Sequence, residues 1–406
     1  MTVIDLPRNA ASRPALRRGA FPAILEQHAE LVPGLWARRV YHAASFTSNA
    51  ADLRGTDERL RGNLDGLALS PEAACTVAAH AWRDGDPGEA FAWCALSLRA
   101  TGDLSIAREN LPALQTQIGA AASAVGFLPR TAAGVHVIAR INSAGDAAIA
   151  ARAGRITGTA SAQQLRSWLS HDDPAVQREA VRFVCEQRAQ PFRQLALESI
   201  ARQQDPVLAL HALLLGGELG AVRSYLPDAS SLESISWQRL AMLRLLGAQS
   251  LRARIVALAP HAALRLALVR LTALHGDCAA LPWLASCITN GVNAITVLEA
   301  CVLMVDSAAL RDALSALEDV SEDAVDRVAP DLHTLRQIVE HATAPAVRVW
   351  PAGTRILGGL EINEANLMRL LARCETTSAV RRHAAVELAA IRSAEPLINT
   401  AAPAAT

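Results

Sequence analysis

Residues 165–185 read LRSWLSHDDPAVQREAVRFVC, and this stretch decides the fold. Apolar residues recur at the spacing of one helical face on both sides of its centre: Leu165, Trp168 and Leu169, then Val176, Ala180, Val181 and Val184. Asp172-Asp173-Pro174 separates the two stripes, because Asp caps a helix and Pro fits its first turn. The stretch therefore predicts two helices joined by a tight turn, with apolar faces that meet.

The same arrangement recurs along the chain. Residues 192–217 repeat the stripe, a turn at Asp205-Pro206 and an apolar second helix. Breaks follow at intervals of about 30 residues, which is a period typical of helical repeats: Gly158, Gln187, Gly217, Gly247, Gly276 and Asp306. One helix pair of this length cannot bury its apolar faces alone, so neighbouring pairs must stack. We expect an all-α fold whose residues 158–343 form a HEAT-like α-solenoid. The alternative is a single compact bundle, against which the regular spacing argues.

The remaining segments lack the clear repeat. We expect a disordered, Arg-containing N-terminus over 1–20, a helical N-terminal domain or cap over 21–150, a Pro/Gly insertion over 344–362, a terminal helical repeat over 363–394 and a disordered tail over 395–406. Pro345, Pro351 and Gly358-Gly359 oppose a regular helix in the insertion, while its β-branched residues permit a short β-hairpin.

Composition supports a helical, cytoplasmic protein. Hydrophobic residues make up 51% of the chain and aromatic residues only 4%, so the core must consist of Ala, Leu and Val. The formal charge is zero, with Arg as the only basic side chain besides His, which argues against a dedicated nucleic-acid binder. The longest apolar run is too short to cross a membrane. Seven scattered cysteines without a C-x-x-C pair indicate reduced thiols in the cytoplasm.

Two blocks of the chain resemble a known family. The first includes Gln27-His28-Ala29-Glu30 and residues 57–67, DERLRGNLDGL; the second includes WPAGTRILGG from Trp350 and RRHAAVELAAIR from Arg381. Together they resemble an uncharacterised proteobacterial family of HEAT-repeat proteins, often encoded in type VI secretion clusters near spike-tip and adaptor genes. The resemblance implies an accessory role in secretion, and it supplies no catalytic residue.

No motif in the chain indicates a catalytic, cofactor or metal site. His28 has no second His at the spacing that a helical metal site needs, so packing or capping explains it better. His171-Asp172-Asp173 lies in a predicted turn, where capping alone accounts for the acids. Residues 57–66 are either a docking surface or a short helix capped by Thr56 or Asp57 and ended by Asp65-Gly66, and the short helix is favoured.

Candidate partner-binding residues come from two observations. Residues 130–166 hold five Arg against Asp146 alone, whereas residues 318–331 hold six acids, so a partner of complementary charge would be oriented along the array. Trp350 lies in the Pro/Gly insertion and is either an exposed anchor for a partner or buried under the insertion. We expect the partner to contact Arg140, Arg152, Arg155, Arg166, Trp350 and Arg355.

These features favour a non-catalytic scaffold or adaptor that binds another protein, with a spike component or effector of a type VI secretion system as the partner implied by the resemblance. The alternatives are a HEAT-like enzyme, of the lyase or DNA-glycosylase kind, and an immunity-type inhibitor. An enzyme would need a deep pocket with clustered acids and aromatics. We expect no cofactor, and the Arg-rich stretch lacks the interleaved aromatics of a nucleic-acid site.

Overall fold

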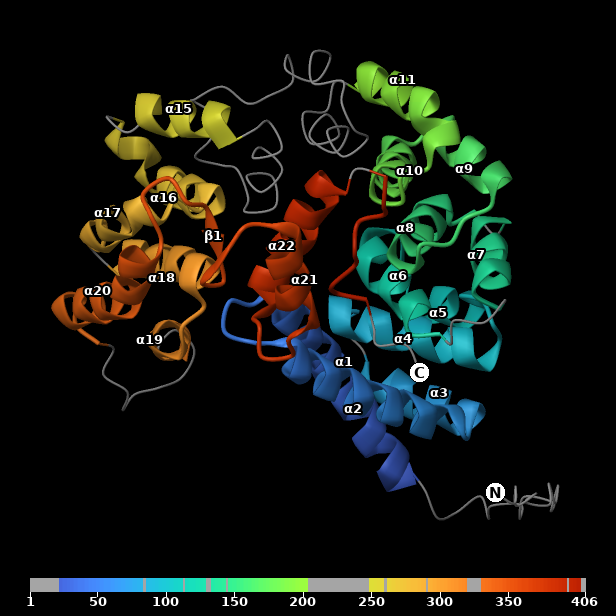
Figure 1. Ribbon diagram of the computed structural model, residues 1–406. Coiled ribbons are helices and arrows are strands. Elements are labelled where there is room, and N and C mark those ends of the chain that lie inside the picture. The colour runs from blue at the N-terminus through green and yellow to red at the C-terminus, as the bar shows by residue number, and fades with distance from the viewer. Residues whose placement is uncertain are drawn as a thin grey trace, which may run out of the picture.

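The computed structural model is built almost entirely from helices (Figure 1). It describes residues 22–82, 85–111, 114–128, 133–143, 145–203, 248–258, 261–289, 291–319, 330–392 and 394–402. The all-α prediction is therefore confirmed, apart from one short hairpin. The turn predicted at Asp205-Pro206 and the breaks predicted at Gly217 and Gly247 lie outside the described residues, as does the segment 1–20.

Most described helices belong to two arms. The N-terminal arm consists of α1 (Pro22–Ala44), α2 (Ala50–Ala68), α3 (Pro71–Ala81), α4 (Pro87–Ala100), α5 (Ser105–Asn110), α6 (Ile118–Gly126), α7 (Ala133–Ser143), α8 (Ala147–Thr157), α9 (Ala162–Leu169), α10 (Pro174–Glu186) and α11 (Arg193–Gln203), with 3-10 helices η1 (Leu114–Gln117) and η2 (Gln190–Phe192). The C-terminal arm consists of α15 (Ala248–Leu258), η6 (Ala262–Leu264), α16 (Arg265–His275), η7 (Cys278–Ala280), α17 (Leu281–Ser286), α18 (Gly291–Val305), α19 (Ala308–Asp319) and α20 (Leu332–Val349).

Helices α9 and α10 form as the opening stretch predicts. Ser161 and Gln164 form a capping box at the start of α9, and the Asp173 carboxylate caps α10, where Pro174 occupies the first turn. The predicted stripes are buried, with Trp168 fully so. Local capping and one apolar face per helix are thus enough to fix this pair.

Alternate helices stack along each arm. In the N-terminal arm α4 contacts α6, α6 contacts α8, and α8 contacts α10, while α7 and α9 pack on the helices that follow them. In the C-terminal arm α16 contacts α18, and α18 contacts α20. The buried residues of both arms form one continuous apolar core.

The breaks between helices repeat in backbone conformation as well as in spacing. Gly158 and Gly276 end α8 and α16 with positive φ angles of 69° and 77°. Arg188 and Asp306, each thirty positions further along, also have positive φ angles, of 52° and 50°. Left-handed residues of this kind end helices, and among the described residues one interval of thirty positions separates such breaks in each arm.

Helix α2 is longer than expected. The Asn49 side chain and the Asp52 side chain form a capping box, which starts the helix about two turns before Thr56 and Asp57. The expected end at Asp65-Gly66 is also wrong, since the helix continues to Ala68. The capping box outweighs the later acids as a start signal, because it satisfies two backbone N–H groups at once.

The insertion begins later than residue 344. Helix α20 continues through Pro345 to Val349, and it tolerates the missing N–H near its end. Strands β1 (Ile356–Leu357) and β2 (Leu360–Glu361) pair antiparallel, so the predicted hairpin lies within the expected range. At its turn the N–H groups of Gly358 and Gly359 donate to the last carbonyls of α18, at 2.9 and 2.8 Å.

Residues 350–402 form a clasp that returns to the N-terminal arm. After the hairpin come α21 (Glu364–Ala372) and α22 (Ser378–Ile391), which pack together between the two arms (Figure 1). Helix α22 contacts both α1 and α18, and the N–H of Ser378 donates to Ser48 O at 2.8 Å. The segment predicted as a terminal repeat is thus a helix pair, but it lies between the arms and does not extend the row.

The expected disorder of residues 395–406 is wrong as far as Ala402, and residues 403–406 lie outside the described part of the chain. The Leu397 N–H donates to Glu186 O at 2.7 Å, and the Asn399 side chain donates to Ile156 O at 3.2 Å. These carbonyls belong to the last turns of α10 and α8, where helices lack internal donors. The tail is therefore held by helix ends that need partners.

Candidate functional site

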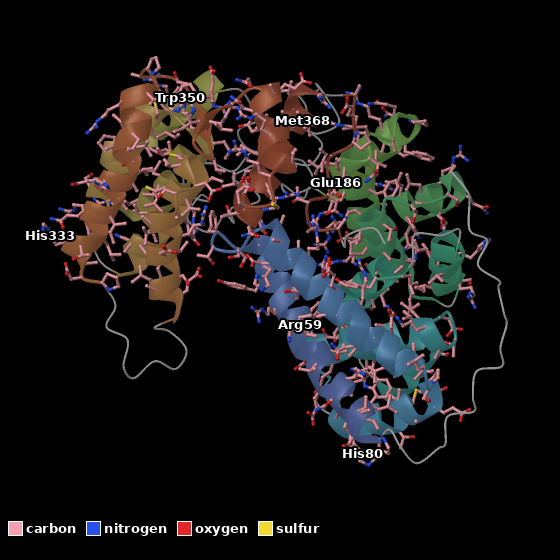
Figure 2. All side chains as sticks on the ribbon, turned by 60° about the horizontal axis from the view of Figure 1, so that its bottom comes forward. Arg59, His80, Glu186, His333, Trp350 and Met368 are labelled. Atoms are coloured by element: carbon pink, nitrogen blue, oxygen red, sulfur yellow. The ribbon has the colours of Figure 1, made fainter. Side chains whose placement is uncertain are left out.

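The six predicted partner-binding residues do not form one site. Arg140, Arg152, Arg155 and Arg166 lie on α7, α8 and α9 of the N-terminal arm. Trp350 follows α20 and Arg355 precedes β1, so both belong to the clasp. Figure 2 shows Trp350 at the end of α20, well apart from Glu186 on the N-terminal arm.

Arg155 is occupied within the molecule. Its guanidinium pairs with Glu179 at 2.7 Å and with Glu186 at 3.1 Å, both on α10. Burial would lower the pKa of Arg155, but these carboxylates outweigh it and raise that pKa above its ordinary value. Arg152, one turn earlier, is half-buried, and burial lowers its pKa against the attraction of Glu179. We conclude that this part of α8 holds α10 in place.

Arg140 and Arg166 are exposed on neighbouring helices. The Trp168 Nε1–H donates to Asn142 Oδ1 at 2.7 Å, which ties α9 to α7. The Arg166 guanidinium lies 5.8 Å from the centre of the Phe192 ring, a cation–π distance. Since these helices flank the row α4–α6–α8–α10, the exposed cations lie on the outer helices of the arm.

Arg355 joins three segments of the fold. Its Nε–H donates to His275 O at 2.7 Å, and its other nitrogen pairs with Glu387 on α22 at 2.6 Å. The side chain is one quarter exposed. The arginine thereby connects the end of α16, the hairpin and α22, so its evident role is to hold the clasp.

Trp350 ends α20 and is half-buried against the core. Its carbonyl accepts from the Cys278 thiol at 3.4 Å. The two valines before it are more accessible, with Val347 40% and Val349 66% exposed. We call Val347, Val349 and Trp350 the α20 tip. Sequence reasoning missed the valines, because residues from 344 onward were expected to form the Pro/Gly insertion and not the last turn of a helix.

The acidic stretch expected to orient a partner, together with the Arg-rich one, lies mostly outside the described residues, which stop at 319 and resume at 330. Glu318 is described, and it accepts a hydrogen bond from Tyr41. Asp331 caps α20 through the N–H groups of His333 and Thr334. These two described acids thus have partners inside the molecule.

The first block that carries the family resemblance has two segments, residues 27–30 and residues 57–67, and these segments contact each other in the structure. The His28 ring on α1 lies 2.8 Å from the Asn63 side-chain oxygen on α2. It also lies against Gly66, where a Cβ atom would approach His28 Nε2 to 2.5 Å. Only a glycine fits there without moving the ring, so these residues form a packing contact between α1 and α2.

The acids and histidines weighed as metal or catalytic candidates have structural roles. The ring nitrogen of His171 accepts from the Asp173 N–H at 3.0 Å, and Asp173 caps α10. Within the described ranges, no three His, Cys, Asp or Glu side chains lie close enough together to hold a metal ion. The same residues contain no helix long and apolar enough to span a membrane.

Comparisons with known proteins add no further constraint. No protein-family model, no curated protein and no solved structure matches this chain.

Proposed function

We propose that the protein is a non-catalytic scaffold or adaptor that binds another protein in the cytoplasm, built as a HEAT-like α-solenoid. The stacking of alternate helices and the thirty-residue interval between left-handed breaks, which occurs once in each arm, support this architecture. Arrays of this kind present long surfaces that suit protein partners. The resemblance implies that the partner is a spike component or effector of a type VI secretion system.

The observation that carries the proposal is the α20 tip. Val347 and Val349 are exposed on the last turn of a well-packed helix, and they flank the exposed Arg348. Trp350 fixes the end of this turn by packing on the core. Interface centres are enriched in aromatic side chains and Arg, and Trp350 and Arg348 supply one of each beside the two valines. The partner that fits this surface presents apolar side chains beside a carboxylate.

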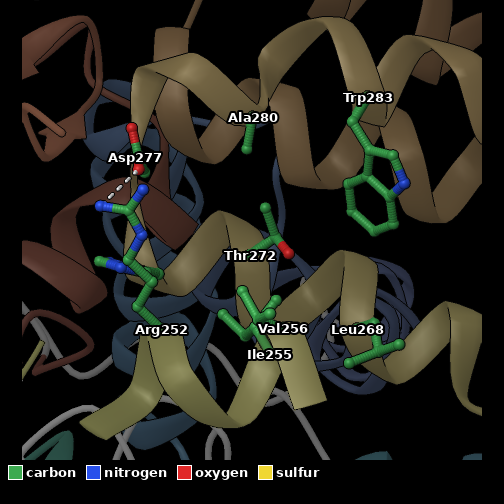
Figure 3. A pocket seen from close by; sticks show the side chains of 9 residues that line it. Arg252, Ile255, Val256, Leu268, Thr272, Asp277, Ala280 and Trp283 are labelled. Atoms are coloured by element: carbon green, nitrogen blue, oxygen red, sulfur yellow. Dashed lines mark ion pairs between the residues drawn. The ribbon is translucent and has the colours of Figure 1, made fainter. Parts of the chain in front are cut away.

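An enzymatic function has less support from the structure. The pocket in the C-terminal arm contains one acid, Asp277, and one aromatic residue, Trp283 (Figure 3), where a lyase or glycosylase of this fold would need clusters of both. An immunity-type role would also use a protein-binding surface, and rescue of a poisoned cell would distinguish it.

Binding between purified proteins tests the proposal. The full chain is titrated with the purified spike-tip and adaptor proteins of a type VI secretion system, and the heat of binding is recorded. We expect saturable binding that weakens at least tenfold in a Val347→Asp, Val349→Asp variant. Leu69→Asp is the matched control, because Leu69 is 70% exposed at the end of α2, and it should bind like the parent chain. Absence of binding to every one of these secretion proteins would refute the partner class, and equal loss of binding in the control variant would refute the surface.

A further inference from the structure

The end of α8 leaves one backbone carbonyl, that of Ile156, without a backbone donor. The N–H groups of Gly158 and Thr159, in the turn that follows, donate at 3.3 and 2.9 Å to the carbonyls of the two residues that precede Ile156. These bonds close the helix end but do not reach the Ile156 carbonyl. The last carbonyls of a helix lack internal donors, so this oxygen needs a donor from outside the helix.

The end of α10 repeats the same arrangement thirty positions further on. The N–H groups of Arg188 and Ala189 donate at 3.4 and 3.0 Å to the carbonyls of the two residues that precede Glu186. Arg188 has a positive φ angle, as Gly158 does in the preceding unit. Glu186 and Ile156 are therefore equivalent positions, and these two helix pairs each present one backbone acceptor at the same place relative to the break.

The tail binds both of these acceptors. The Leu397 N–H donates to Glu186 O at 2.7 Å, and the Asn399 side-chain amide donates to Ile156 O at 3.2 Å. Figure 1 shows the tail as a thin red trace that leaves α22 and passes α10 and α8 toward the C label. Two donors only two positions apart in the tail thus bridge equivalent helix ends of successive repeat units.

Two arginines hold the tail on either side of these donors. Arg188 Nε donates to Glu395 O at 3.3 Å, and Arg39 donates to Ala401 O at 2.6 Å. Arg39 is kept in place by its ion pair with Asp57, at 2.6 Å. Both bonds go to main-chain carbonyls, which every peptide possesses, so the arginines would hold another segment equally well.

The side chains of the tail add a requirement for sequence. The Asn399 side-chain oxygen accepts from the Ala401 N–H at 3.1 Å, which directs the amide nitrogen to Ile156 O. An aspartate has no donor and would place an anionic oxygen against that carbonyl. Leu397 is half-buried, whereas Ile398 between the two donors is 44% exposed. The recognised pattern is therefore a leucine followed two positions later by an asparagine.

The tail lies on the surface and takes no part in the core. None of residues 395–402 is buried, and none belongs to the apolar core or packs against it. Segments with few buried apolar contacts open at a low cost in free energy. The surface under the tail can thus be vacated while the helices beneath it stay packed.

We propose that this row of helix-end carbonyls, with Arg39 and Arg188 beside it, is a binding surface for a non-helical segment of a partner protein, and that the tail occupies it until such a segment takes its place. The partner's segment carries a leucine followed two positions later by an asparagine. Main-chain hydrogen bonds supply affinity, and the two side chains supply specificity. The α20 tip lies on the other arm, so this proposal does not depend on the proposed function.

Fluorescence anisotropy of a labelled synthetic peptide, residues 394–402, tests the proposal on the full chain. A chain variant with Leu397→Pro and Asn399→Asp lacks both tail donors, so its surface should be open. We expect saturable binding of the peptide to this variant, at least tenfold tighter than to the parent chain, whose own tail competes. Ile398→Ala in the chain keeps both donors and should bind the peptide as weakly as the parent chain does.

Changes in the peptide test the recognised pattern. Methylation of the Leu397 nitrogen removes one donor and Asn399→Asp removes the other, so each should weaken binding at least fivefold. Ile398→Ala in the peptide is the matched control and should change the affinity by less than about twofold. A peptide that keeps only the leucine and the asparagine, in a background of alanine and serine, should bind within about fivefold of the tail peptide.

Four results would overturn the proposal. They are no saturable binding to the chain that lacks both tail donors, equal affinity of that chain and the parent, binding that survives both donor changes in the peptide, or loss of binding by the peptide that keeps only the pattern. A dimer of the parent chain that the peptide dissociates, seen by sedimentation, would assign the surface to the tail of a second copy and would also overturn the proposal. Circular dichroism confirms that each variant is folded. Partner binding at the α20 tip is measured separately, so either idea can fail alone.

Discussion

The Tyr41 hydroxyl on α1 donates a hydrogen bond of 2.7 Å to the Glu318 carboxylate on α19, across 277 positions of sequence. The first described helix thus touches the penultimate helix of the C-terminal arm directly. Tyr41 is 48% exposed, so this bond forms at the surface. The buried connection between the arms is made by α22 of the clasp, which contacts α1 and α18.

Tyr41→Phe should therefore have a small effect on the stability of the fold. An exposed hydrogen bond contributes about 0.5–1 kcal/mol, so we expect a loss of that size in the free energy of unfolding measured in urea. Glu318→Gln should cost no more than this. A loss above about 2 kcal/mol in either variant would contradict the assignment of the main connection to α22.

Two glycines of α2 make a matched pair for testing the contact between α1 and α2. Gly66→Ala places a Cβ atom 2.5 Å from His28 Nε2, so the ring must move and its contact with Asn63 is lost. We expect a loss of roughly 1–3 kcal/mol in the free energy of unfolding. Gly62→Ala meets nothing within 4 Å and should stabilise the helix by about 0.5–1 kcal/mol. Equal effects at both positions would disprove the close approach of His28.

Substitution of Arg39 should lower the free energy of unfolding more than substitution of most other charged residues. It pairs with Asp57 at 2.6 Å, with both side chains nearly inaccessible, and it donates to Ala401 O in the tail. Removal of one buried partner leaves an uncompensated charge, so Arg39→Met and Asp57→Asn should each cost about 3–5 kcal/mol in urea unfolding. Arg59→Met, on the exposed side of α2, is the control and should change stability by less than about 0.5 kcal/mol.

Arg39→Met should also free the tail. Limited proteolysis should cut the chain near residues 395–402 faster in this variant than in the parent protein. An unchanged cleavage rate would show that the hydrogen bonds to Glu186 and Ile156 are sufficient to hold the tail.

Stability should fall as the solution is made mildly acidic, in part through His42. Burial, and then the nearby Arg38, lower the pKa of His42 below 6.5, and its ring accepts from Arg38 Nε at 2.9 Å. The unfolded chain therefore takes up the proton first as the pH falls below about 6.5, which favours unfolding until the folded pKa is passed. The contribution of His42 to the free energy of unfolding is fully present above the unfolded pKa of about 6.5 and is lost as the pH falls through the folded pKa.

We expect His42→Gln to flatten the decline in unfolding free energy between about pH 7.5 and pH 5.5 relative to the parent chain. NMR titration of the His42 ring should give a midpoint below 6.5. A midpoint at or above that value, or an equally steep decline in the variant, would rule out this contribution.

Local signals in the sequence predicted the helix pairs well and the distant contacts poorly. The turn at Asp173-Pro174 is set by residues next to it, so α9 and α10 could be predicted. Arg155 looked available for a partner because Glu179 and Glu186 lie 24 and 31 positions away, and only the fold brings them to it. Arg355 looked available for the same reason, since its internal partner Glu387 is 32 positions further on.

The α20 tip was also out of reach of sequence reasoning. Residues from 344 onward were expected to form the Pro/Gly insertion, whereas α20 continues to Val349. The exposure of Val347 and Val349 becomes visible only when the last turn of this helix is placed against the core.

The return of α22 to α1 has a consequence for biosynthesis. The N–H groups of Ser378 and Ala379 donate to Ser48 and Ser45, so the loop after the first helix is completed by residues made more than three hundred positions later. On the ribosome, the α1 surface that α22 covers stays open until nearly the whole polypeptide has emerged. Contacts between such distant positions form slowly, so a nascent chain of this protein needs protection from aggregation until translation ends.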